Sequence, residues 1–392
     1  MVSLALVATA HAQSSEITAL IRLAQERSSL VKAAQSIVDA RRASLSGARI
    51  NPGPSLEVAP GVGYTNGNSV LSQEFDLFGR RRASSKLAQA NLKLAQIEVM
   101  RAQQDVSQEF LVNVAKLHSA NGEVEGARLS LESAKALQVA VAKQHEIGEA
   151  PRVHVTRAEV DVLRATQHLT IAEGRLRSTK LALQSLLGQE IPLTSLAWPE
   201  IEEIGTIARS FDLMRAAQQV GIVEALVDMS RSAFAPTFTA GLATDIWSLD
   251  RNAFKRDNVG LQLSLRMPLF DSGQRRAALN ASRNEVVSAQ AVVSEAQRFA
   301  DLKLAEATSA FETAKTVAAS YEGDVLPKGE SMLTAMREGY ASGLVTLVEV
   351  LEAQQTLAKL RQDHIQAVLN LRLAEVELWK AQLILPGTEV PR

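Results

Sequence analysis

Apolar residues recur at intervals of three and four along most of this 392-residue chain, which is the spacing of one face of an α-helix. The clearest run covers 80–144, where Ala90, Leu94 and Ile97 keep this spacing and no proline interrupts it. About 65 residues at 1.5 Å per residue make a helix of roughly 100 Å, longer than any globular core. Such a helix must pack against neighbours of similar length.

The same spacing predicts further helices. A return partner of the first is expected at 153–187, and a second pair at 274–338 and 346–383. A shorter helix is expected at 14–47. Gly122 with Gly126, and Gly323 with Pro327, are weak helix formers at corresponding places in the two halves, so we expect matched bends there.

Strict alternation of apolar and polar residues predicts β-strands at 237–247 and 259–267, joined by a charged loop. The apolar positions expected on one face include Phe238, Leu242, Val259, Leu261, Leu263 and Leu265. A second hairpin is predicted at 55–77, across the turn signal Thr65-Asn-Gly-Asn68. Each strand is about as long as a transmembrane β-strand, so we expect the apolar face to contact lipid. A half-buried sheet of a soluble protein is the alternative reading.

Two pairs of segments repeat within the chain: 72–82 resembles 264–276, and 148–159 resembles 343–354. An internal duplication is therefore expected. A short apolar run before Ala10-His-Ala12 predicts a secretory signal. The predicted division is a signal peptide at 1–12, a first repeat at 13–190 (hairpin 55–77, helix pair 80–187), a connector at 191–205, a second repeat at 206–385 (hairpin 236–268, helix pair 274–383) and a tail at 386–392.

Composition agrees with long packed helices rather than with a compact enzyme. Apolar residues make up 46% of the chain but aromatic residues only 4%, so the core must use small aliphatic side chains. The net charge of -1 makes nucleic acid an unexpected partner. With no cysteine, disulfides and thiolate metal sites are excluded.

Catalytic motifs are missing from the sequence, since it has no phosphate-binding Walker loop, no H-E-x-x-H and no G-x-S-x-G. We therefore expect no enzyme activity and no cofactor. His145 and His154 flank the turn near Gly148 and allow a metal-contact reading, against ordinary surface or partner contacts. Their spacing is not a recognised ligand pattern.

Taken together, these segments resemble the TolC-like outer-membrane efflux proteins. The phrases at 71–81, 267–273 and 339–352 are typical of that family. With 155–160, the first phrase is most similar to the outer-membrane components of heavy-metal efflux systems of the cobalt, zinc and cadmium type.

The resemblance implies a mainly α fold with a small β part. Three chains would form a homotrimer, whose twelve strands close an outer-membrane β-barrel in lipid and whose long antiparallel coiled-coil helices form a periplasmic α-barrel tunnel. It also implies docking of a periplasmic adaptor protein at the turns of Gly148 and Gly343, and an inner-membrane RND-type pump.

Four residues match functional positions of that family. Glu349 and Glu352 lie three apart on one helical face and match acidic residues that narrow the inner tunnel mouth. Tyr340 matches a tyrosine that latches the closed mouth, and the matching acid is replaced here by His154. A Tyr340 to His154 hydrogen bond would make the latch sensitive to pH.

The sequence therefore predicts a passive exit duct of a tripartite efflux pump, which conducts heavy-metal cations from periplasm to exterior. Two alternatives remain open. One is a duct of the same fold for drugs, other organic compounds or exported proteins. The other is a soluble periplasmic coiled-coil scaffold.

Overall fold

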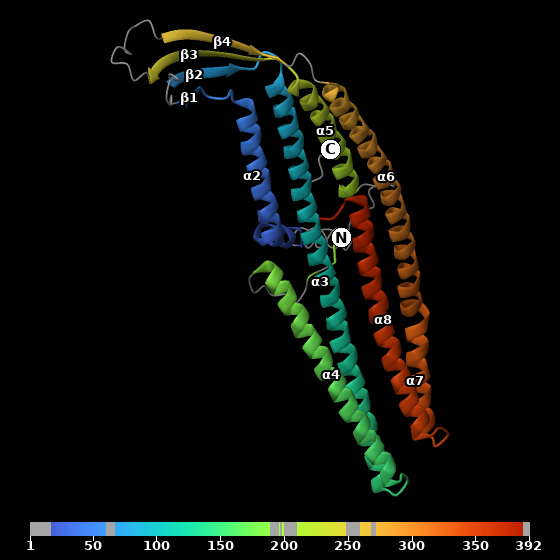
Figure 1. Ribbon diagram of the computed structural model, residues 1–392. Coiled ribbons are helices and arrows are strands. Elements are labelled where there is room, and N and C mark those ends of the chain that lie inside the picture. Colours follow the sequence, from blue (N-terminus) through green and yellow to red (C-terminus); the bar gives the residue numbers. More distant parts are fainter. Residues whose placement is uncertain are drawn as a thin grey trace, which may run out of the picture. The chain divides into compact units, whose positions relative to one another are not determined.

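A computed structural model describes residues 17–59, 67–188, 196, 198–199, 210–247, 259–267 and 272–386. The expected mainly helical fold with one small antiparallel sheet is confirmed (Figure 1). The predicted signal peptide and the loop predicted between residues 247 and 259 lie outside the described residues, as does most of the predicted connector. Of the turn predicted at 65–68, Gly67 and Asn68 are described and belong to a strand. The chain divides into two compact units. The first unit draws on 1–32, 100–210 and 300–392, and the second on 33–99 and 211–299.

Helices make up most of the described chain. After a helical segment at 17–27, the helices are α2 (Ser29–Arg49), α3 (Arg80–Glu146), α4 (Arg152–Leu187), α5 (Phe211–Ala233), α6 (Gln274–Ser320), α7 (Leu326–Ala341) and α8 (Leu347–Gln382). The 67 residues of α3 form one uninterrupted helix. No described helix has both the length and the apolar character needed to cross a membrane.

The single helix expected at 274–338 is interrupted, and the matched bends stay a prediction. A π-helical turn, η2 (Tyr321–Val325), separates α6 from α7. Pro327 has no N–H to donate to the carbonyl of Gly323, and the Leu326 N–H instead bonds the Tyr321 carbonyl five residues back. Because Gly122 lacks a side chain, Ile365 of α8 packs close to it: a Cβ there would lie 3.4 Å from Ile365. That glycine therefore allows close packing of α8 against α3.

The sheet lies in the second unit and is fully antiparallel. Its strands β1 (Ser55–Ala59), β2 (Gly67–Phe75), β3 (Thr237–Trp247) and β4 (Val259–Arg266) are ordered β1-β2-β3-β4. The central pair, β2 with β3, joins the hairpin of the first half to that of the second. Strand β2 ends earlier than residue 77 because the carboxylate of Asp76 accepts the backbone N–H groups of Arg80 and Arg81 and so caps α3.

The main core lies in the first unit, where the helical segment at 17–27 meets α3, α4 and α8. Its most enclosed members share aliphatic or aromatic side chains: Ile17, Ile21, Phe110, Leu111, Val114, Leu117, Leu183, Leu187 and Val376. Trp198, from the predicted connector, packs on this core. Its ring stacks on Trp379 at 5.8 Å, and its indole N–H donates to Glu375 at 2.9 Å. The described part of the connector is thus anchored to α8.

Candidate functional site

Two helix turns of the first unit carry most of the sequence-predicted site residues. The turn between α3 and α4 contains Gly148 (φ 84°), and the turn between α7 and α8 contains Gly343 (φ 75°). Both glycines have left-handed backbone conformations that residues with a Cβ rarely adopt. The N–H groups of Glu149 and Leu344 donate to the carbonyls of Gln144 and Gly339, each at 2.8 Å. The two turns therefore have the same backbone design.

The second turn ends in a capping box, which the sequence analysis missed. The Thr346 N–H and hydroxyl donate to the Glu349 carboxylate at 2.7 and 2.8 Å, and the Glu349 N–H donates back to the Thr346 hydroxyl. These hydrogen bonds, first from the backbone and then from the side chain of Thr346, lower the pKa of Glu349 below its ordinary value. The signal was readable as T-x-x-E before an apolar run.

The first turn is closed differently. The ring Nδ1 of His145 lies 2.8 Å from the Ala150 carbonyl oxygen, so this nitrogen carries a proton and donates. Pro151 precedes α4 and supplies no side-chain hydrogen bond to the helix start. In the described part of the chain, no three or more His, Asp or Glu side chains converge in a way that could hold a metal ion.

Tyr340 joins two helical hairpins of the first unit, one formed by α3 and α4 and the other by α7 and α8. Its hydroxyl donates to the Gln144 side-chain oxygen at 2.5 Å, and its ring packs on a cluster that includes Val141, Leu347 and Val350. Burial raises the pKa of Tyr340, so the phenol stays protonated as a donor near neutral pH. Gln144 was not among the expected partners. The pairing of Tyr340 with His154 stays a prediction.

A second polar link lies deeper along the same hairpins. Arg337 of α7 and the amide nitrogen of Gln354 of α8 both donate to the hydroxyl of Ser133 on α3, the latter at 3.0 Å. Local sequence spacing does not indicate such links, because each joins residues about 200 positions apart. Together with the Tyr340 bond, they tie α7 and α8 to α3.

Glu349 and Glu352 both lie on the exposed side of α8, whereas Val350, Leu351 and Ala353 are buried. This position leaves Glu352 open to water. The carboxylate of Glu349 is occupied by Thr346 within its own chain. The ring of carboxylates around a tunnel mouth stays a prediction.

The sheet of the second unit has one apolar face and one polar face. Strand register places Leu56, Leu71, Leu242 and Leu261 in one row across all four strands. These leucines are 65, 46, 50 and 73% exposed in the single chain. Phe75, Phe238 and Leu265 form a parallel row, and Leu263, 63% exposed, lies between the two rows. The side chain of Val259 lies outside the described residues.

The opposite face of the sheet carries small and polar side chains. One row contains Ser55, Ser72, Gly241 and Gln262. Gly241 is required by close approach, because a Cβ there would lie 2.7 Å from the Leu71 carbonyl oxygen. A sheet with one exposed apolar face and one polar face is suited to lie between lipid and water.

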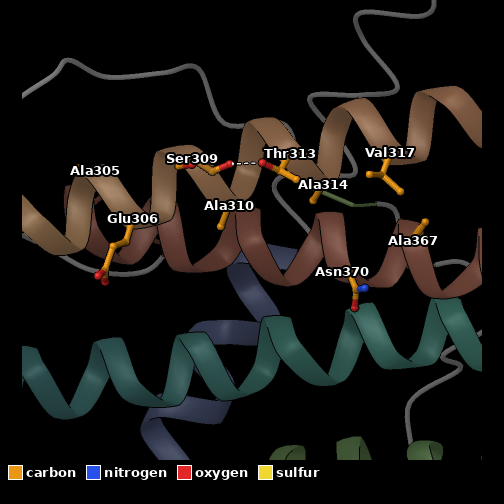
Figure 2. A pocket seen from close by; sticks show the side chains of 9 residues that line it. All are labelled: Ala305, Glu306, Ser309, Ala310, Thr313, Ala314, Val317, Ala367 and Asn370. Atoms are coloured by element: carbon orange, nitrogen blue, oxygen red, sulfur yellow. Dashed lines mark hydrogen bonds between the residues drawn. The ribbon is translucent and has the colours of Figure 1, made fainter.

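A groove of about 740 Å³ runs along α6 and α8 in the first unit (Figure 2). Alanine dominates its lining, which consists of Ala305, Glu306, Ser309, Ala310, Thr313, Ala314, Val317, Ala367 and Asn370. The Thr313 hydroxyl donates to the Ser309 carbonyl, as Figure 2 shows, so it is directed to its own helix. Short side chains of this kind allow close approach of another helix.

Comparison with known proteins identifies the class. A model of the outer membrane efflux protein family matches residues 20–189 and again residues 206–382. The chain belongs to the outer membrane efflux protein family. The family consists of efflux channels and not of enzymes, and its location is the outer membrane, with the helical part in the periplasm.

Individual relatives are distant but similar over most of their length. The pyoverdine export outer membrane protein OpmQ of Pseudomonas aeruginosa is 24% identical over 334 residues, which cover 79% of this chain and 68% of that protein. The cobalt-zinc-cadmium resistance protein CzcC of Cupriavidus metallidurans is 22% identical over 358 residues, or 88% and 84% of the two chains. The crystal structure of CusC is similar in fold, with a TM-score of 0.78 and 18% identity over 94% of this chain and 92% of that one.

Proposed function

We propose that the chain is one subunit of a homotrimeric exit duct of a tripartite efflux pump. The duct conducts cargo passively from periplasm to exterior and performs no chemistry of its own. A periplasmic adaptor protein and an inner-membrane RND-type pump supply selection and energy. The observation that carries the proposal is the two-faced sheet of the second unit, with its exposed leucine row.

Oligomerisation follows from the number of strands. The described sheet has four strands, with β1 and β4 at its edges. Four strands are too few to close a barrel, and open edges inside a membrane leave backbone groups without partners. Three copies would supply twelve strands, which closes the sheet in lipid. The alanine-rich groove along α6 and α8 supports the same assembly, because its short side chains would let a helix of a neighbouring subunit approach closely.

Heavy-metal cations are the proposed cargo. Three copies of Glu352 would hold a local negative potential at the narrow mouth of the tunnel, which favours cations. Similarity to CzcC agrees with this cargo, whereas similarity to OpmQ supports the alternative of organic cargo. The adaptor is proposed to dock at the turns of Gly148 and Gly343.

Two experiments test these proposals. The first compares strains with and without the gene for growth in zinc, cobalt and cadmium salts and in a panel of dyes and antibiotics, with cell-associated metal quantified. Metal accumulation in the deletion strain supports the cation duct. Hypersensitivity to organic compounds alone would contradict the heavy-metal cargo but not the proposed duct.

The second experiment measures ion selectivity of the purified protein in planar bilayers. The Glu352→Gln variant is expected to lower the ratio of cation to anion permeability toward unity. Glu312→Gln, an exposed glutamate on α6, is the matched control and should leave the ratio unchanged. An unchanged permeability ratio in Glu352→Gln would contradict the proposed carboxylate ring.

A further inference from the structure

Eight arginines gather at one end of the sheet in the second unit. They stand at the helix and strand ends that meet there and are called the arginine collar below. The collar consists of Arg49, Arg80, Arg81, Arg82, Arg231, Arg266, Arg275 and Arg276.

Topology brings these distant residues to one place. Phe75, at the end of β2, pairs with Phe238 near the start of β3, and Thr237 pairs with Arg266 at the end of β4. All four connections between sheet and helices therefore leave from the same end, where α2, α3, α5 and α6 begin or end (Figure 1).

The collar is exposed to solvent. Every one of its residues is exposed. Among the described residues, the carboxylates near them are Glu74, Asp76 and Asp228. The Asp76 carboxylate accepts the backbone N–H groups of Arg80 and Arg81 at 3.0 and 2.6 Å, so it caps a helix and does not hold a guanidinium.

The described carboxylates near Arg80 and Arg231 neutralise little of the charge of these two arginines. Arg80 approaches Glu74 at 3.8 Å and Arg231 approaches Asp228 at 3.9 Å. Both are long, exposed pairs, which water and salt screen strongly. Arg81 bonds the neutral side chain of Asn51. Four further collar arginines are exposed and add positive charge at this end of the sheet, although the whole chain is close to neutral: Arg49, Arg82, Arg266 and Arg276.

An apolar surface borders the collar directly. The row of the apolar face nearest the collar contains Phe75 and Leu265. The chain continues from these strands into Leu77, Phe78 and Met267. These five side chains are 43 to 66% exposed. A guanidinium can extend from the edge of such a surface while its methylene stem stays against the apolar side chains.

We propose that the arginine collar binds the phosphate groups of anionic phospholipids in the periplasmic leaflet of the outer membrane. The proposal rests on the proposed lipid-facing role of the sheet. A guanidinium presents paired N–H donors that match phosphate oxygens, and the neighbouring apolar rows receive the acyl chains. Charge and apolar surface together select a phospholipid over free phosphate.

The test measures lipid retention by the purified full-length chain. Native mass spectrometry in neutral detergent compares phosphatidylglycerol with phosphatidylcholine, with and without excess inorganic phosphate. A triple variant, Arg49→Gln, Arg82→Gln and Arg276→Gln, is compared with a control triple variant on α4, Arg157→Gln, Arg164→Gln and Arg177→Gln. All six positions are exposed, so folding is expected to be retained.

The collar variant is expected to lose phosphatidylglycerol affinity by about fivefold per arginine at low salt, with phosphatidylcholine retention unchanged. The corresponding Arg→Lys variant keeps the charge and should recover most of the loss. Unchanged phosphatidylglycerol retention overturns the proposal, as does an equal loss in the α4 control. Displacement of the lipid by inorganic phosphate would show that the site recognises phosphate alone.

Bilayer conductance separates this proposal from the duct itself. A collar variant that conducts normally but retains no anionic lipid supports the collar and leaves the duct intact. A wild-type protein that is absent from outer-membrane fractions and forms no channel contradicts the duct, whatever its lipid retention.

Discussion

The turn between α3 and α4 and the turn between α7 and α8 share one backbone conformation and differ in the side chains that stabilise it. Gly148 and Gly343 occupy equivalent left-handed positions, and the equivalent carbonyls of Gln144 and Gly339 accept the turn N–H groups. Beyond the turn, α8 begins with the capping box of Thr346, whereas α4 begins after Pro151 without a side-chain cap. The two halves thus share the backbone conformation of the turn but stabilise it with different side chains.

The difference continues in the first helical residue after each turn. Leu347 of α8 is buried in the cluster with Val141 and Val350, whereas Arg152 at the same place in α4 is exposed. The second turn is therefore anchored by a core, a cap and the Tyr340 bond. The first turn has no side-chain cap, and its contacts are the His145 bond, the buried Ala150 and Val155, which packs on the edge of the same cluster. We expect substitutions at equivalent places to have unequal effects.

The largest inequality is expected for Leu347→Ala against Arg152→Ala. Leu347 is 1% exposed, and its truncation leaves a cavity that costs about 2–5 kcal/mol. The exposed Arg152 should cost within about 0.5 kcal/mol. Hydrogen exchange of the assembled protein, read on peptides from the start of α8 and of α4, measures the free energy of local opening. Equal losses at the two sites would contradict the unequal anchoring.

Much of this arrangement was predictable from local sequence. Helical spacing indicates α3 and α8, and alternation indicates β3 and β4, because burial on one face imposes those periods on each element alone. The role of Gly122 was not predictable, since it depends on Ile365, more than 200 residues away. The hydrogen bond between Tyr340 and Gln144 was not predictable for the same reason. It joins two helical hairpins, and no local sequence spacing encodes how they align.

A smaller effect is expected for Gly339→Ala. The new Cβ would lie 2.5 Å from a methyl carbon of Val345, a distance that forces the turn to shift. Such overpacking costs about 1–3 kcal/mol, against a helix propensity gain of about 1 kcal/mol for replacing glycine. The equivalent position, Gln144, already carries a side chain, so Gln144→Ala introduces no clash.

Rescue distinguishes the clash from other causes. In the double variant Gly339→Ala, Val345→Ala, the obstructing methyl groups are gone, and hydrogen exchange of the second turn should slow again relative to Gly339→Ala alone. Further destabilisation in the double variant would show that the Val345 contact is not the source of the cost.

The capping box is expected to contribute about 1 kcal/mol, as measured by Thr346→Ala. Pro151→Ala in the first turn removes no side-chain hydrogen bond and should leave local opening nearly unchanged. Hydrogen exchange on the first turns of α8 and α4 compares the two. A similar cost at both helix starts would contradict the difference in capping.

Acid should abolish the part of the cap that depends on Glu349. Because its folded pKa lies below the ordinary value of 4.5, its stabilisation is present above that pH and is lost as the pH falls through the folded pKa. Glu349→Gln should therefore weaken the start of α8 at pH 7, and the difference from wild type should disappear in strong acid. A difference that persists there would assign the effect to something other than the carboxylate charge.

The smallest effect is expected for Tyr340→Phe, which removes the bond between the hairpins and keeps the ring in its cluster. A neutral hydrogen bond contributes about 0.5–1.5 kcal/mol, and water can replace part of it at this half-buried site. The ring alone should therefore hold α7 near α3, so the opening of both turns should change by no more than about 1 kcal/mol. A double-mutant cycle with Gln144→Ala isolates the pair, and a coupling energy near zero would show that the apolar cluster, and not this bond, joins the two hairpins.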